Sequence, residues 1–257
     1  MITISTWNVN SLRARLPLVL HYLETYRPHV LCLQETRIGA AAFPQSAFEA
    51  AGYHVASTGA GGYAGVAVAS TYPIDETVSG IDSFVEKRAP GRRLLCRIGS
   101  LWIDTVYVPT RMAIGKSGFL EGLRRDHIAR FDGAAPDVLA GDFNICFDAR
   151  DYASPSMITA PDVHPNRPED LAFRALVSGR LVDCFRRKTA DGGHFSWFPM
   201  APWAPRRNYG MRLDYLFATE ALAARLADVV HDRETRDWQR PSDHVPVRAS
   251  FDVDVSA

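Results

Sequence analysis

A short apolar run that ends in a glycine and two polar residues most constrains how this chain can fold. It reads Val138-Leu139-Ala140-Gly141-Asp142-Phe143-Asn144-Ile145. Its length and apolar character are typical of a buried strand. Because alternate strand residues face the same way, we expect Asp142 and Asn144 to project together while Phe143 turns into the core. A carboxylate and an amide there can orient a water and bind an oxyanion, although a polar turn after a buried strand would look the same.

The N-terminal part predicts a strand, a helix and a second strand. Residues 2–9 alternate and are rich in β-formers, and residues 30–34 are continuously apolar up to Gln34. Between them Val19, Leu23 and Tyr26 recur at helical spacing, and Pro28 ends the helix. This order suggests a crossover between neighbouring sheet positions. Further strands are predicted over 66–69, 94–98, 101–108, 194–198, 212–218, 226–230 and 245–253, and helices over 118–131 and 171–177.

The glycine-rich stretch 59–65 is interpreted as a hairpin turn rather than a phosphate cradle, because no Gly-Lys-Ser/Thr follows it. Residues 150–167 form an irregular proline-rich loop, and a loop of that length in a compact domain is more often functional than idle.

Composition indicates an ordinary globular protein with one domain over residues 1–257. The chain is 47% hydrophobic and 23% charged, its formal net charge is zero, and it shows no linker or repeat. Its four scattered cysteines suit buried free thiols better than zinc ligands or disulfides. No signal peptide and no apolar run of membrane-spanning length is present, so we expect a cytoplasmic protein. The sequence carries no signal for oligomeric state, and a monomer is the default expectation. A nucleic-acid partner would require a local basic face.

Polar side chains gather at the predicted strand ends. They are Asn8, Asn10, Glu35, Tyr107, Asp142, Asn144, Asp214, Asp243 and His244. Arg212 and Asp214 are expected to share one strand face. Each residue alone has a structural explanation: Asn8 could cap a helix, Tyr107 could be an edge aromatic, and His244 could be a satisfied interior histidine. Their joint appearance at strand ends favours a site, because crevices at sheet edges are where sites form.

The chemistry of this set favours a hard cation. Carboxylate and amide oxygens with a single obvious histidine suit Mg²⁺ or Mn²⁺ better than zinc, and Glu35 is the best anchor. An Asp-His pair beside a metal suits attack on a phosphate ester. The chain has no serine nucleophile elbow and no cysteine in a recognisable catalytic setting.

Six motifs follow one another along the chain. They are Trp7-Asn8-Val9-Asn10-Ser11-Leu12-Arg13-Ala14, Leu33-Gln34-Glu35-Thr36-Arg37, Tyr107-Val108-Pro109, Gly141-Asp142-Phe143-Asn144-Ile145, Asn208-Tyr209-Gly210-Met211-Arg212-Leu213-Asp214-Tyr215 and Ser242-Asp243-His244. In this order and spacing they make the chain resemble the exonuclease III family of abasic-site DNA endonucleases, within the endonuclease/exonuclease/phosphatase superfamily. The resemblance covers residues 1 to about 252.

The resemblance implies a four-layered α/β sandwich, in which two packed mixed β-sheets are flanked by helices and the site lies at the sheets' shared edge. It implies that Glu35 ligates Mg²⁺, with Mn²⁺ as a substitute, helped by Asn8, Asn10 or Asp243. It also implies that Asp142 orients or deprotonates the attacking water and that Asn144 steadies it. His244, held by Asp214, would contact the scissile phosphate, while Tyr107 and Asn208 would stabilise the developing negative charge.

The resemblance further implies contacts with double-stranded DNA that is abasic or blocked at its 3′ end. Trp197, Met211 and Leu213 would line a pocket for the flipped-out deoxyribose, and Arg37, Tyr63 and Arg111 would touch the backbone. Arg37 departs from the family, which commonly has lysine after Gln-Glu-Thr. Arg206, Arg207 and Lys116 are further candidates for a basic face, or are simply solvated. His164 either narrows the sugar pocket or is an exposed loop residue.

Three functions fit these observations. The leading one is a Mg²⁺-dependent DNA-repair nuclease that incises 5′ to abasic sites and trims 3′ ends. The second is a phosphatase or phosphodiesterase acting on a small or lipid phosphate ester. The third is a non-catalytic DNA-binding module, which the completeness of the polar set disfavours.

Overall fold

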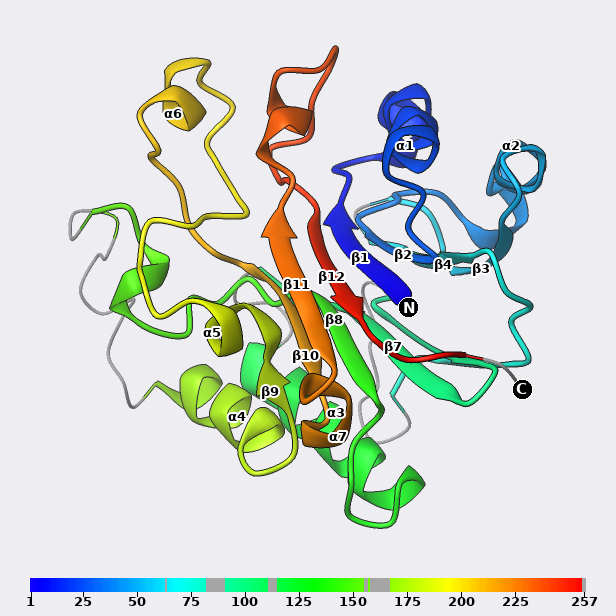
Figure 1. Ribbon diagram of the computed structural model, residues 1–257, viewed down its shortest axis with the longest axis vertical. Coiled ribbons are helices and arrows are strands. Elements are labelled where there is room, and N and C mark those ends of the chain that lie inside the picture. Colours follow the sequence, from blue (N-terminus) through cyan, green and yellow to red (C-terminus); the bar gives the residue numbers. More distant parts are fainter. Residues whose placement is uncertain (63, 82–90, 111–114, 155–156, 158–166, 256–257) are drawn as a thin grey trace.

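Two six-stranded sheets form the centre of the molecule (Figure 1). The computed structural model describes residues 1–62, 64–81, 91–110, 115–154, 157 and 167–255. The first sheet has the order β11-β12-β1-β2-β4-β3, with β1 (Ile2–Asn8), β2 (Val30–Gln34), β3 (His54–Thr58), β4 (Val66–Ser70), β11 (Leu226–His231) and β12 (Val247–Phe251). The second has the order β5-β6-β7-β8-β10-β9, with β5 (Glu76–Ser79), β6 (Arg93–Ile98), β7 (Leu101–Tyr107), β8 (Val138–Asp142), β9 (Val182–Asp183) and β10 (Asp214–Ala218).

Each sheet contains one parallel pair near its centre. β1 pairs with β2 and β7 pairs with β8 in parallel, while the other named pairs are antiparallel. Parallel neighbours need a long crossover, usually a helix. Here the crossovers are α1 (Leu12–Tyr26) and α3 (Lys116–Arg130). The predicted strand-helix-strand unit at the N-terminus is therefore confirmed.

Alternation along the buried strands divides their side chains between two layers of core. On β2, Val30 and Cys32 face the core between the sheets, whereas Leu31 and Leu33 pack toward α1. Helices α1 and α2 (Gln45–Ala50) cover the first sheet, and α3 and α4 (Pro168–Val177) cover the second (Figure 1). The predicted four-layered sandwich of two mixed β-sheets is confirmed. The remaining helices are short: α5 (Cys184–Lys188), α6 (Trp203–Arg206) and α7 (Glu220–Ala223).

A polar contact crosses between the sheets close to their shared edge. The amide of Gln34, fully buried at the end of β2, donates to the hydroxyl of Thr6 on β1 and to that of Thr105 on β7, both at 2.9 Å. A buried amide must keep its hydrogen bonds, so these contacts fix how the two sheets align.

Three predicted strands differ from the structure by two or more residues, among them the strand expected over 245–253, which spans only Val247–Phe251. Residues 194–198 do not form a strand, because Trp197 makes single bridges to Met211 and to His244 on two different segments. Pro199 follows Phe198 and cannot donate a ladder hydrogen bond. The strand expected over 212–218 begins only at Asp214.

Other predictions agree with the structure. β3 and β4 pair antiparallel on either side of residues 59–65, as expected for a hairpin. The four cysteines are free and buried, and burial raises the pKa of the Cys32 thiol to about 12. Among the described residues, no helix has both the length and the hydropathy needed to cross a bilayer.

We expect Gly141→Ala to destabilise the protein by at least about 3 kcal/mol, since it adds a close contact to an unfavourable backbone conformation. Gly141 has a φ of +149°, and a Cβ there would lie 2.0 Å from the carbonyl oxygen of Val106 on β7. Gly133→Ala is the matched control. Its φ is +85° and nothing lies within 4 Å, so it should lose only about 1 kcal/mol. Urea unfolding measures the free energy of unfolding of both variants. Equal decreases would show that a Cβ at position 141 does not clash with the carbonyl oxygen of Val106 on β7.

Candidate active site

One carboxamide connects the polar residues of the two sheets. Asn8, the last residue of β1, donates from Nδ2 to Glu35 Oε1 at 2.9 Å and to Asp142 Oδ2 at 2.8 Å. Its oxygen accepts the backbone N–H of Asn10 at 2.9 Å, which fixes the amide with its NH₂ toward the carboxylates. Asn8 is fully buried. The structure therefore uses Asn8 to hold two carboxylates together, and the ligand role expected for its oxygen is not evident from this geometry.

Asp142 and Asn144 do converge, but not by strand alternation. β8 ends at Asp142, and Asn144 has a left-handed φ of +51°. The Asn144 backbone N–H donates to Asp142 Oδ1 at 2.8 Å, and its side-chain amide donates to Asp142 Oδ2 at 3.2 Å. The extended geometry expected here is wrong because the carboxylate folds the chain into an Asx-type turn. Phe143 is buried in the core as expected.

His244 lies between two carboxylates. Its Nδ1 is 2.8 Å from Asp214 Oδ2, and its Nε2 is 3.8 Å from Asp142 Oδ2. Burial alone would lower the pKa of His244, but the charges of Asp214 and Asp142 raise it to about 10. Burial raises the pKa of Asp142 to about 7, against the lowering effect of His244. At neutral pH the imidazole is therefore protonated and donates to Asp214.

Ser196 positions Asp214, and the sequence analysis missed it. Its hydroxyl donates to Asp214 Oδ2 at 2.6 Å and accepts the backbone N–H groups of Leu213 and Asp214 at 3.0 and 2.9 Å. The one sequence signal was a small polar residue inside the aromatic run Phe195-Ser196-Trp197-Phe198. The fully buried hydroxyl fixes the start of β10 relative to His244.

Asp243 accepts hydrogen bonds from side chains of two other segments. Asn10 Nδ2 donates to its Oδ1 at 2.9 Å, and Trp197 Nε1 donates to its Oδ2 at 3.1 Å. Trp197 also exchanges backbone hydrogen bonds with Met211, at 2.8 and 2.9 Å. The structure thus brings Asn10, Asp243, Trp197 and Met211 together, with Trp197 between the carboxylate and the apolar residue.

Tyr107 lies beside Glu35 at the end of β7. Burial, the charges of Glu35 and Asp142 and a hydrogen bond to Glu35 raise the pKa of its hydroxyl. The guanidinium carbon of Arg92 lies 4.6 Å from the centre of the Tyr107 ring. Tyr107 therefore keeps its proton and can act as a hydrogen-bond donor.

Arg37 contacts Glu35 directly. Its Nη2 lies 2.6 Å and its Nε 3.1 Å from Glu35 Oε2. Both residues have left-handed backbone conformations, with φ of +55° and +49°. Such conformations are uncommon for residues other than glycine and gather at functional sites.

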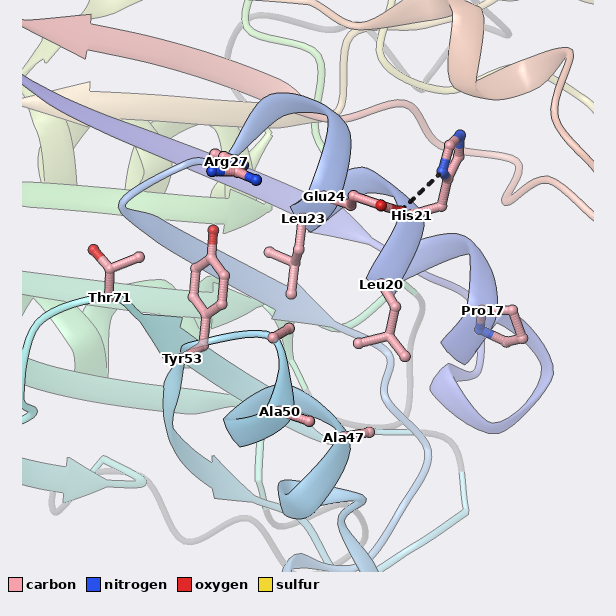
Figure 2. A pocket seen from close by; sticks show the side chains of 11 residues that line it. Pro17, Leu20, His21, Leu23, Glu24, Arg27, Ala47, Ala50, Tyr53 and Thr71 are labelled. Atoms are coloured by element: carbon pink, nitrogen blue, oxygen red, sulfur yellow. Dashed lines mark ion pairs between the residues drawn. The ribbon is translucent and has the colours of Figure 1, made fainter.

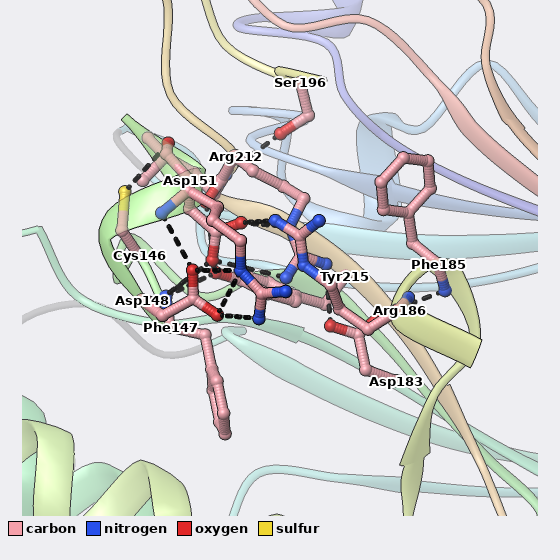
Figure 3. Close-up of polar contacts among 12 residues, drawn as sticks. Cys146, Phe147, Asp148, Asp151, Asp183, Phe185, Arg186, Ser196, Arg212 and Tyr215 are labelled. Atoms are coloured by element: carbon pink, nitrogen blue, oxygen red, sulfur yellow. Dashed lines mark hydrogen bonds and ion pairs between the residues drawn. The ribbon is translucent and has the colours of Figure 1, made fainter. Parts of the chain in front are cut away.

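A buried ion cluster holds the segment that precedes Asp214 (Figure 3). Arg212 Nε lies 2.7 Å from Asp151 Oδ1, and its Nη1 lies 2.7 Å from Asp183 Oδ2. Asp151 also accepts from the backbone of Phe147 at 3.0 Å. The expectation that Arg212 and Asp214 share one strand face is wrong, because Arg212 precedes β10 and pairs with Asp151 while Asp214 binds His244.

Two further predicted residues, Asn208 and Leu213, are described by the structure, and three others lie outside the described residues. Asn208 donates from Nδ2 to the carbonyl oxygen of Gly193 at 2.8 Å, and its buried Oδ1 has no hydrogen-bond partner among the residues that the structure describes. Leu213 is buried, with 8% of its surface exposed. Tyr63, Arg111 and His164 lie outside the described residues, so their predicted roles have no structural account.

The candidate basic residues Lys116, Arg206 and Arg207 differ in their exposure. Lys116 donates to the carbonyl oxygen of Asn144 at 2.6 Å, and burial lowers the pKa of its amine. Lys116 therefore supports the turn that carries Asn144. Arg206 and Arg207 are exposed, and Arg207 lies over the ring of Trp203.

Among the described residues, Asp142, Asp214 and His244 have ligand atoms within 4.8 Å of one another and could hold a metal ion. His244 would first have to lose one of its two ring protons, because only an unprotonated nitrogen can bind a metal ion. The predicted set of Glu35, Asn8, Asn10 and Asp243 offers only carboxylate and amide oxygens, which suit a hard cation better. The choice of ligands stays a prediction.

A cavity of about 700 Å³ lies away from these residues, between α1 and α2 (Figure 2). Leu20 and Leu23 line it from α1, and Ala47 and Ala50 line it from α2. None of its lining residues belongs to the predicted site.

The chain is similar over nearly its whole length to known nucleases. It is 28% identical to exodeoxyribonuclease III from Haemophilus influenzae over 96% of this chain and 98% of that protein. An AP endonuclease from Archaeoglobus fulgidus superimposes with a TM-score of 0.87 and 30% identity, covering 98% of this chain and all of the other. The 3′ phosphatase NExo from Neisseria, bound to a product DNA hairpin, gives 0.88 and 29% with the same coverage. Residues 5–244 match the model of the Endonuclease/Exonuclease/phosphatase family. The chain therefore belongs to the endonuclease/exonuclease/phosphatase family, and it is a phosphodiester hydrolase of the exonuclease III type.

Proposed function

We propose that the protein is a Mg²⁺-dependent DNA-repair nuclease that hydrolyses the phosphodiester 5′ to abasic sites and trims blocked or normal 3′ ends of duplex DNA. One observation carries the proposal: a protonated His244 lies 3.8 Å from the buried carboxylate of Asp142, which Asn8 ties to Glu35 on the other sheet. We also propose that residues 1–257 act as one domain and as a monomer.

Glu35 and Asp243 would hold the divalent ion, with Asn10 beside them. Their oxygens are the ligands that Mg²⁺ prefers, and Mn²⁺ accepts the same set. The bound ion would polarise the phosphate and neutralise charge that develops on it. Asn8 would serve by fixing Glu35 relative to Asp142, because its own oxygen already accepts from Asn10.

Side chains of the protein would activate the water and stabilise the charge on the phosphate. The unprotonated Asp142 would orient the attacking water and take its proton, with Asn144 steadying that water. The imidazolium of His244 would donate to the scissile phosphate, and Asp214 would hold its ring. Tyr107 keeps its proton and would donate to the developing negative charge, together with Asn208.

Substrate contacts would surround this centre. Trp197, Met211 and Leu213 would receive the flipped-out sugar, which an abasic nucleotide offers at low cost because it has lost its stacking partner. Arg37, Tyr63 and Arg111 would contact the DNA backbone. Similarity to the Neisseria 3′ phosphatase favours work at 3′ ends as a second activity of the same site.

A fluorescent duplex containing a tetrahydrofuran abasic analogue tests this proposal. Incision in Mg²⁺ supports it, and removal of a 3′ phosphate from a second duplex would show the 3′ activity. Phosphate release from small or lipid esters alone would indicate a phosphatase. Binding without cleavage would indicate a DNA-binding module.

Chelation should abolish cleavage, because the carboxylates around Asn8 need a cation to accept a phosphate. We expect EDTA to stop incision, added Mg²⁺ or Mn²⁺ to restore it, and Glu35→Ala to raise the metal concentration required at least tenfold (about 1.4 kcal/mol). Initial rates over a metal titration measure this. Full cleavage after exhaustive chelation would refute the metal requirement.

His244 and Asp214 should act as one unit. His244→Gln and Asp214→Asn should each lower kcat by a large factor, on the order of 100-fold or more, and the double variant little further. A double variant whose loss is the product of the single losses would show that the two residues act separately.

The interaction between His244 and Asp214 should also make the stability of the metal-free protein depend on pH. The pKa of His244 rises from about 6.5 in the unfolded chain to about 10 in the folded protein. Its contribution to stability is therefore complete below about pH 6.5 and is lost as the pH rises through about 10. Asp214→Asn should lower this pKa, which ¹⁵N NMR of the ring in EDTA measures. An unchanged titration would contradict the pairing.

Trp197→Ala should weaken abasic-site incision far more than trimming of an ordinary 3′ end, because only the first needs a pocket for a flipped sugar. Trp197→Phe keeps a ring but removes the hydrogen bond to Asp243, so it separates pocket shape from support of that carboxylate. Trp238→Ala, at another partly buried tryptophan, controls for general loss of packing. Both rates are measured on the same duplex with and without the analogue. If Trp197→Ala lowers the two activities equally, Trp197 does not line the sugar pocket.

A further inference from the structure

We propose that Arg37 couples metal binding to DNA binding: its guanidinium holds Glu35 until a DNA phosphate takes the guanidinium and leaves the carboxylate to the metal ion. This inference rests on the proposed function, since it assigns Glu35 to the metal and a phosphate to the substrate. It adds a role for Arg37 beyond contact with the DNA backbone.

Both oxygens of Glu35 already have protein partners. Oε2 receives Nη2 and Nε of Arg37 at 2.6 and 3.1 Å, and Oε1 receives the amide of Asn8 at 2.9 Å. The Glu35 side chain is 12% exposed. The carboxylate is therefore both neutralised and largely shielded, and an ion that approaches Oε2 meets the positive guanidinium.

The backbone around Glu35 and Arg37 is held by hydrogen bonds, so any movement on ligand binding has to come from the side chain of Arg37. The N–H of Arg37 donates to Ala64 and that of Thr36 donates to Gly65, both at 3.0 Å. The chains approach so closely that a Cβ on Gly65 would lie 2.3 Å from Thr36 Oγ1. The Arg37 side chain, by contrast, is 34% exposed. Its head group can move toward solvent or toward a ligand while its Cα stays in place.

Asn8 and Arg37 differ in how they affect an incoming cation. Asn8 is neutral and also binds Asp142, so it can remain in place when an ion arrives. Arg37 carries a full charge, and within the described residues it is the cation that the structure pairs with Glu35. Arg15 is close enough to influence the site electrostatically, but it donates to the carbonyl oxygen of Asn10. Repulsion between the ion and Arg37 is therefore the main cost of metal entry that a side chain can relieve.

A phosphate offers the guanidinium an alternative partner of the same charge sign as Glu35. The planar fork of arginine suits two phosphate oxygens, whereas the compact ammonium of lysine binds as a point charge. Moving Arg37 onto phosphate frees Oε2 for the metal. Because coupling between two ligands is reciprocal, DNA should tighten metal binding and metal should tighten DNA binding by the same factor.

Competition between Arg37 and the metal ion predicts the direction in which metal affinity changes when Arg37 is replaced. An arginine that only contacts DNA leaves metal affinity unchanged when it is replaced. An arginine that competes with the metal raises metal affinity when it is replaced. We therefore expect Arg37→Met to bind Mn²⁺ about tenfold more tightly than the wild type in the absence of DNA, within the usual range of such couplings.

Mn²⁺ titration followed by electron paramagnetic resonance tests this without relying on activity. The proteins are the wild type, Arg37→Met, Arg37→Lys and Arg13→Met, each with and without a short phosphorothioate-protected duplex. Arg13 is an exposed arginine at the start of α1, so Arg13→Met controls for the loss of one positive charge nearby. DNA should tighten Mn²⁺ binding about tenfold in the wild type and Arg13→Met, but not in Arg37→Met. Arg37→Lys should be intermediate.

Two results would overturn the coupling. One is an Arg37→Met protein, folded by circular dichroism, that binds Mn²⁺ no more tightly than the wild type. The other is the same DNA effect in Arg37→Met as in the wild type. If the wild type cleaves the abasic duplex and either result is found, only the coupling fails. If the wild type cleaves no DNA in Mg²⁺, the proposed function fails, and the Mn²⁺ titration without DNA still reports whether Arg37 competes for Glu35.

Discussion

The carboxamide of Asn8 is the contact on which the site depends, because it joins two sheets whose strands form separate hydrogen-bonded ladders. Its NH₂ group reaches Glu35 beyond β2 in the first sheet and Asp142 at the end of β8 in the second. Each carboxylate would repel the other without a donor between them. Gln34 makes a similar connection slightly deeper, between Thr6 and Thr105. The apolar core brings the sheets together, and these two amides set their alignment at the edge where the chemistry is proposed.

The sequence predicted the parts of the fold that depend on apolar periodicity and on chain length. The continuous run Val30–Gln34 is a central strand with those bounds because both of its faces are buried, and α1 and α3 span the crossovers that parallel pairs require. The segment around Trp197 could not be predicted in this way. It looks like a strand by residue type, yet its hydrogen bonds go to two partners distant in the chain, which no local pattern encodes.

The sequence predicted which residues belong to the site better than it predicted how they are arranged. Strand ends and motif resemblance identified residues such as Asp142, His244 and Asp243, which the structure brings close together. The means of convergence differ from expectation, since Asn144 folds back onto Asp142 through a left-handed turn rather than by alternation. Supporting residues such as Ser196 escaped notice because a buried hydroxyl gains its role only from the groups around it. Local sequence carries no trace of those tertiary partners.

The charge balance of the site supports the proposed metal requirement, although the chain as a whole has zero net charge. Four carboxylates converge here, those of Glu35, Asp142, Asp214 and Asp243, and within the part of the chain that the structure describes two cations pair with them, His244 and Arg37. With Asp142 ionised, the excess is equivalent to the charge of one divalent cation. Burial makes this excess of negative charge costly, and burial is also the main cause of the raised pKa of Asp142. A bound ion would remove that cost and restore Asp142 to the unprotonated form that a general base needs. The same excess would repel a phosphate, so the cation is also what would admit the DNA backbone to this edge of the sheets.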